Sequence, residues 1–222
     1  MDLGIQNLWL FILAGWVLNL TPGPDVFYMV THALKGGWRA GTVAMLGISA
    51  GCLVHVLAAT LGVSALIAAS ITAFTVLKLV GAAYLVYVGI KMLCSQPTDG
   101  FEDATNSVAS YAGNTMATDL NHYKNIFQQG FFTNVLNPKV ALFFLAFLPQ
   151  FISPSASAPW VAFALLGLLF IVDSVPINLG YVLLASWLRA RSGGLQRGML
   201  WLERTAGALF VGFGVKLAFS ER

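Results

Sequence analysis

The chain has 222 residues, of which 58% are hydrophobic and only 9% are charged, and its mean hydropathy is +0.78. Soluble domains carry about 25% charged residues, so this chain has too few charges to cover a globular surface, and the lipid bilayer must be its solvent. The net charge of +3 is modest and the basic residues lie between apolar runs, which argues against nucleic acid as a partner.

The apolar runs predict an all-α integral membrane protein with six transmembrane helices. The predicted spans occupy residues 3–24, the run 40–77 (the second span and the start of the third, which ends near Lys91), and residues 130–152, 159–188 and 200–219. The first run lacks the basic segment of a signal peptide, so we expect it to be retained. The fifth run is long and holds Pro176, so we expect it to tilt or kink.

The basic residues predict the orientation, because cytoplasmic loops of membrane proteins carry an excess of Lys and Arg. With six spans, the three basic connections lie on one side: Lys35 and Arg39, Lys91 and Lys124, and Arg189, Arg191 and Arg197. That side should be the cytoplasm, which leaves both termini outside, in the periplasm.

The two halves of the chain resemble each other weakly, since Leu20-Thr21-Pro22 is echoed by Leu136-Asn137-Pro138 and Phe27 falls in step with Phe143. A duplicated unit with three spans must insert in opposite orientations, as in many secondary transporters. We therefore expect one transmembrane domain, 1–222, built from two inverted three-helix repeats (1–94 and 126–222) around a polar cytoplasmic loop (95–125), with broken first and fourth helices.

The first break is expected at Thr21-Pro22-Gly23-Pro24-Asp25. Pro22 and Pro24 lack the N–H groups that would bond the carbonyls of Leu18 and Leu20, and Pro24 suits the first turn of a renewed helix with Asp25 behind it. Such carbonyls can accept from an ammonium, and the positive end of the restarted helix can hold a carboxylate. These are the two charged ends of an amino acid; the alternative is a kink near the inner end of the span, with Asp25 facing the headgroups.

The second break is expected at Asn137-Pro138-Lys139, where Pro138 orphans the carbonyl of Asn134 and Asn137 is a candidate N-cap. Lys139 then sits where its own helix dipole disfavours a cation. We hypothesise that Asp25 and Lys139 approach each other as a gate or a cargo clamp. Alternatively, Lys139 extends to the cytoplasmic surface.

Three further polar residues are candidates for ion coupling. His55 lies midway along the second span and Asp173 midway along the fifth, where charges facing lipid are costly. Asn178, past Pro176, extends the same patch. For His55 the alternative is a neutral ring bonded to a neighbouring carbonyl.

Other small residues predict packing. Gly47 and Gly51 form a GxxxG stripe that lets helices approach closely, within one chain or in a homo-oligomer. Cys52 and Cys94 form neither a disulfide framework nor a CxxC site, and no motif indicates a cofactor or a bound metal.

These motifs resemble the signature of the lysine exporter (LysE/RhtB) family of amino-acid exporters, homoserine/threonine efflux type. The resemblance rests on residues 21–25, on Gly47, Gly51 and His55, and on residues 81–89, 137–139 and 143–151. It implies a bacterial inner-membrane secondary transporter, coupled to protons, that exports amino acids such as homoserine, threonine, leucine, lysine or cysteine. The residues implied to line the path are Thr21, Pro22, Gly23, Pro24, Asp25, Asn137, Pro138 and Lys139.

Two alternatives stay open. The same scaffold can carry a cation or another small solute, although the apolar spans lack clusters of metal ligands. A membrane enzyme is the other alternative, but the sequence has no HExxH, GxSxG or similar constellation, so we expect no enzyme activity.

Overall fold

The computed structural model describes residues 3–63, 119–153 and 155–188, together with eight single residues between positions 72 and 94. The described parts are helical apart from short connections and one isolated bridge, between Ile5 and Ile152. The elements are α1 (Leu8–Leu20), α2 (Pro24–Ala58), η1 (Ala59–Val63), α6 (Asp119–Val135), α7 (Pro138–Leu142), η2 (Phe143–Phe147), η3 (Leu148–Phe151) and α8 (Pro159–Leu188). The third predicted span (those eight residues apart), the sixth span, most of the polar loop and the last basic connection lie outside them.

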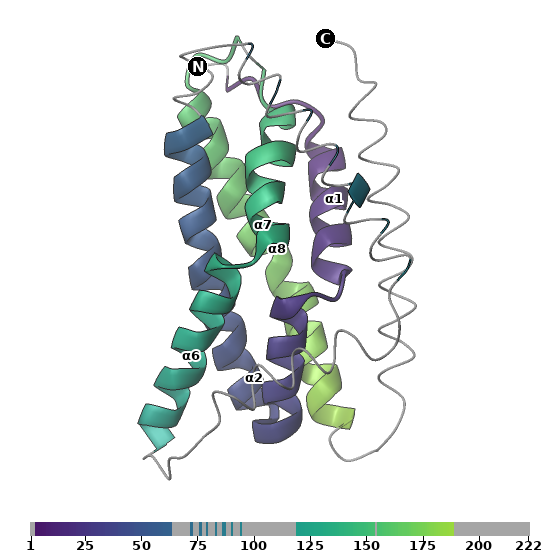
Figure 1. The fold of residues 1–222 in the computed structure, drawn as a ribbon, viewed down its shortest axis with the longest axis vertical. Helices are drawn as coiled ribbons and strands as arrows, with labels where there is room; N and C mark the ends of the chain where they lie inside the picture. The colour runs from purple at the N-terminus through teal and green to yellow at the C-terminus, as the bar shows by residue number, and fades with distance from the viewer. Residues whose placement is uncertain are drawn as a thin grey trace.

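Helix α2 is a hairpin of two helices. Its turn is at Gly37, whose φ of 75° and ψ of −172° are not helical. A glycine adopts this positive φ without steric cost, and Gly41 on the returning arm lies against Ala33. Figure 1 shows the first arm continuing the direction of α1 and the second arm running back beside it. Lys35 and Arg39 are exposed at this turn, as expected for a connection between spans.

Two helices extend beyond the predicted apolar runs, because both breaks lie in the middle of a helical path. The first path runs from Leu8 through the break at residues 21–23 and on to the turn at Gly37, instead of ending at residue 24. The second begins with α6 at Asp119, inside the expected loop 95–125, instead of at residue 130. The polar residues of α6 hid this start, although an Asp in the first turn favours one.

Helices long and apolar enough to cross a membrane are present among the described residues. Pro24–Gly62, counted as one stretch despite its turn at Gly37, and Pro159–Leu188 both qualify, and Asn121–Val135 with Pro138–Phe151 form a broken pair bent by 47°. The predicted break in the fourth span is thus confirmed. Helix α8 is assigned as continuous through Pro176.

Two hydrophobic clusters hold the helices together. One is aromatic and joins α1, the returning arm of α2, the segment from α7 to η3, and α8, with Phe11, Phe143 and Phe163 at most 1% exposed. The other joins both arms of α2 to α6 and α8, around Met29, Ala44 and Val182. The two helix breaks lie between these clusters.

Candidate functional site

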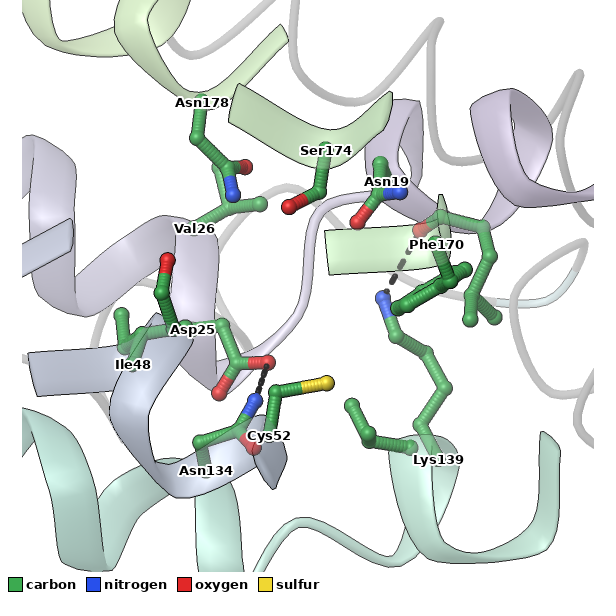
Figure 2. Close-up of a pocket in the computed structure, with 13 residues that line it drawn as sticks. Asn19, Asp25, Val26, Ile48, Cys52, Asn134, Lys139, Phe170, Ser174 and Asn178 are labelled. Atoms are coloured by element: carbon green, nitrogen blue, oxygen red, sulfur yellow. Dashed lines mark hydrogen bonds between the residues drawn. The ribbon is translucent and has the colours of Figure 1, made fainter. Parts of the chain in front are cut away.

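The two breaks meet at one cavity in the middle of the helices (Figure 2). Its walls come from α1, both arms of α2, α6, α7 and α8. The lining residues are Leu18, Asn19, Asp25, Val26, Ile48, Ser49, Cys52, Asn134, Lys139, Val140, Phe170, Ser174 and Asn178. The cavity volume is about 30 Å³, which holds a water molecule or two.

Lys139 extends from the start of α7 to the end of α1. Its Nζ donates to the carbonyl oxygens of Leu18, at 3.2 Å, and of Thr21, at 3.0 Å. The position of a Cβ on Gly23 would lie 3.1 Å from the same nitrogen, so the lack of a side chain at Gly23 makes room for the ammonium. A cation is disfavoured at the N-terminus of its own helix but favoured at the C-terminus of another, which explains where this side chain goes.

The other two carbonyls that lose a helical N–H donor because of a proline also accept hydrogen bonds from side chains far away in the sequence. The carbonyl of Leu20 accepts from the hydroxyl of Tyr181 on α8 at 2.8 Å. The carbonyl of Asn134 accepts from Nε2 of His55 at 2.9 Å. His55 therefore carries its proton on Nε2 and bonds a neighbouring carbonyl, as its alternative interpretation predicted.

Asp25 occupies the first turn of α2, directly after Pro24, as predicted. Its side chain is 9% exposed, and its Oδ2 accepts from Nδ2 of Asn134 at 3.0 Å. The positive end of the restarted helix stabilises the carboxylate there. Asp25 and Lys139 thus reach the same cavity from different elements (Figure 2).

Asn137 is the N-cap of α7, as predicted: its Oδ1 accepts from the backbone N–H of Lys139 at 3.0 Å. This bond fixes the side chain at 2% exposure beside the cavity.

Three buried polar atoms around Asp25 make no hydrogen bond of good geometry: Oδ1 of Asp25, Oδ1 of Asn134 and Nδ2 of Asn137, although the Asn137 amide lies close enough to the Asp25 carboxyl to interact with it. Buried polar atoms are nearly always paired, and an unpaired one costs about 1–3 kcal/mol. Two of the three are acceptors, and one of these belongs to a carboxyl group, which is negatively charged when it is ionised. The site is therefore suited to a small donor with a positive charge.

Asp173 lies apart from this group. Its Oδ1 accepts from Nε1 of Trp16 on α1, and its Oδ2 lies 3.2 Å from the position of a Cβ on Gly15. It is partly exposed and does not line the cavity, whereas Asn178 and Ser174 on the same helix do. Asn178 and Asp25 thus line the same cavity, and Asp173 lies outside it.

A family model for the LysE type translocator matches residues 16–221 of the chain. The chain belongs to the LysE translocator family. It is therefore a multi-pass membrane protein of a transporter family.

Relatives of this LysE chain match it over nearly its whole length. An uncharacterized membrane protein of Pseudomonas aeruginosa is 33% identical over 97% of this chain and 96% of its own. The homoserine/homoserine lactone efflux protein of Salmonella typhimurium is 29% identical over 94% of each chain. The leucine efflux protein of the same organism is 26% identical over 98% of this chain and 97% of its own. No solved structure matches.

Part of the site of this LysE translocator could not be predicted from its sequence. The side chains of Asn134, Ser174 and Asn19 line the cavity, and Tyr181 satisfies the first break, but neutral polar residues in apolar helices give little signal. Asn134 could have been found, because it lies in the last turn of a helix and three residues before Asn137, so both amides reach the same break.

Proposed function

We propose that this LysE translocator exports small amino acids or their derivatives across the bacterial inner membrane, as a secondary transporter coupled to protons. The observation that carries the proposal is the buried carboxylate of Asp25 at the crossing of two broken helices, with one oxygen lacking a donor. A buried carboxylate with one oxygen unbonded is costly in a low-dielectric interior, so a cationic cargo group is stabilised there. Two relatives named for leucine efflux and for homoserine and homoserine lactone efflux support the cargo class.

The transport cycle follows from the size of the cavity. A cavity of about 30 Å³ is too small for an amino acid, so the site has to widen to admit cargo and to open to either side in turn. We infer that the two breaks belong to two inverted repeats that rock against each other, with the cytoplasm on the side of Lys35 and Arg39. On the opposite side, two backbone hydrogen bonds join the segment before α1 to the segment around the end of η3. Gln6 N donates to Phe151 O at 2.8 Å, and Ser153 N donates to Gly4 O at 2.8 Å.

Proton coupling is assigned to Asp25, since a carboxylate can hold either a proton or an ammonium but not both. Competition for one carboxylate forces the protein to release cargo before it returns with a proton. Within the described part of the chain, the titratable or charged groups around Asp25 are Lys139 on α7, and His55 and Cys52 on the returning arm of α2. Lys139 and His55 are held by backbone carbonyls, which leaves the carboxylate as the group that changes partner.

The proposal is tested by efflux from bacterial cells loaded with a panel of dipeptides, following every amino acid released. The intact chain is compared with the Pro22→Ala/Asp25→Asn variant and with Gly180→Ala, whose added methyl group meets nothing within 4 Å. Selective release of one or a few amino acids that only the first variant abolishes is the expected result. Release equal to that of empty cells, with the protein present in the membrane, contradicts amino-acid export and favours a cation or another solute.

A further inference from the structure

We infer that the cavity recognises its cargo by the ammonium group, and that the cargo's carboxylate is dispensable. This rests on the proposed function and narrows it: the substrates are small primary amines, and a neighbouring carbonyl group, where there is one, can belong to an acid, an amide or a lactone. The inference rests on two observations. Two acceptor oxygens, Asp25 Oδ1 and Asn134 Oδ1, have no hydrogen-bond donor, and the ammonium of Lys139 beside them is already bound to the backbone.

The acceptor side of the site is incomplete. Asp25 Oδ1 and Asn134 Oδ1 both lack a partner, and the two side chains are fixed relative to each other by the bond from Asn134 Nδ2 to Asp25 Oδ2. The orientation of the Asn134 amide is set by that bond, because only its nitrogen can donate to a carboxylate. An ammonium has three N–H donors and a positive charge, so it satisfies both oxygens and compensates the buried charge. A neutral amide nitrogen, as in an N-acylated amino acid, does not.

The cationic donor of the site, unlike the amide of Asn137, is already bound to the backbone. Lys139 is the only cationic residue that lines the cavity, considering the residues that the structure describes. Its Nζ is bound to the carbonyls of Leu18 and Thr21 at the C-terminal end of α1, where Thr21 is fully buried. Turning this ammonium towards a cargo carboxylate would leave the carbonyl of Thr21 without its donor, at a cost of about 1–3 kcal/mol. Lys139 therefore stabilises the C-terminal end of α1 and is not available to bind the cargo's carboxylate.

The remaining walls suit an uncharged group. Asn19, Ser174 and Asn178 lie together on one side of the cavity in Figure 2, where they offer neutral donors and acceptors. These side chains can bind a carbonyl oxygen of an ester, an amide or an acid alike. The apolar walls, from Val26, Ile48 and Phe170, leave the cargo's side chain in contact with hydrocarbon.

The test is a matched set of ligands on the purified full chain in detergent, with binding measured by calorimetry. The probes are L-leucine, L-leucinamide, 3-methylbutylamine, N-acetyl-L-leucine and 4-methylpentanoate, with L-homoserine, its lactone and its N-acetyl lactone run in parallel. We expect the ligands with an ammonium to bind within about threefold of one another. We expect the N-acetyl compounds and 4-methylpentanoate to bind at least about 10-fold more weakly, since they lack a charged donor for Asp25.

Variants separate the roles of the two charges. Asp25→Asn should weaken leucine and leucinamide alike. Lys139→Met should leave the ratio of their dissociation constants unchanged, whatever it does to stability, and Lys139→Gln repeats the measurement with a donor retained. A Lys139 variant that weakens leucine but not leucinamide overturns the inference, as does loss of binding when the carboxylate alone is removed.

Different results would refute recognition by the ammonium and amino-acid export. Acids that bind while their carboxylate-free analogues do not would refute recognition by the ammonium alone and leave amino-acid export standing. If neither the acids nor the analogues bind, both the inference and the export of these amino acids are contradicted.

Discussion

Replacing Gly51 by alanine couples the packing of α2 and α6 to the geometry of the site. A Cβ at position 51 would lie 2.5 Å from the carbonyl oxygen of Phe131 and 2.9 Å from Cβ of Asn134. An ordinary C···O contact is about 3.3 Å, so the added methyl group displaces α6 by about 0.8 Å. That shift is enough to lengthen the bond from Asn134 to Asp25, now 3.0 Å, beyond the limit of about 3.2 Å for a hydrogen bond.

The expected effect of Gly51→Ala is therefore on stability and on transport together. Overpacking of this kind costs about 1–3 kcal/mol, and for a chain of this size that lowers the melting temperature by roughly 2–12 °C. The assay is thermal unfolding of the purified protein in detergent, with efflux measured in cells at matched protein levels.

Gly180→Ala on α8 is the matched control. Its Cβ meets nothing within 4 Å, so the change should leave the melting temperature the same or slightly higher, because alanine is favoured over glycine in a helix by about 1 kcal/mol. Equal melting temperatures and equal efflux for Gly51→Ala and Gly180→Ala would refute the close packing of α2 on α6.

Three other changes test single contacts of the site. In a double-mutant cycle, Asp25→Asn and Lys139→Gln should be non-additive by about 0.5–3 kcal/mol in unfolding free energy, since both charges line one cavity; additive effects would contradict their interaction. Tyr181→Phe removes the donor to Leu20 O and should lower stability by about 0.6–1.7 kcal/mol in thermal unfolding, against no change for Tyr123→Phe; equal values for both would remove Tyr181 from the break. Asp173→Asn should keep efflux that follows an imposed pH gradient, because this carboxylate bonds Trp16 outside the cavity; loss of that response would return Asp173 to the coupling scheme.

The prolines made the two breaks predictable from the sequence. A missing N–H orphans a known carbonyl, so the unsatisfied groups on Leu18, Leu20 and Asn134 could be named without a structure. Their partners could not be named. Lys139, Tyr181 and His55 lie 121, 161 and 79 residues away from them along the chain, and only the packing of the helices brings each side chain to its carbonyl.

The span boundaries were less predictable, because hydropathy is a weak guide where a helix carries polar groups. The first path continues past the break for a further arm of α2, up to Gly37, and α6 begins among polar residues at Asp119. Likewise, Asp173 and Asn178 are one turn apart in sequence and look equivalent. The direction of their side chains sends Asn178 into the cavity and Asp173 to Trp16.

The most direct test of the account is transport by the purified chain in proteoliposomes under an imposed pH gradient. L-leucine and L-homoserine are supplied as labelled probes, and the intact chain, Asp25→Asn and Gly180→Ala are compared at equal insertion. The account predicts that the intact chain and Gly180→Ala accumulate a probe against its gradient, and that Asp25→Asn does not. Accumulation by Asp25→Asn equal to that of the intact chain would contradict the assignment of cargo and proton to one carboxylate.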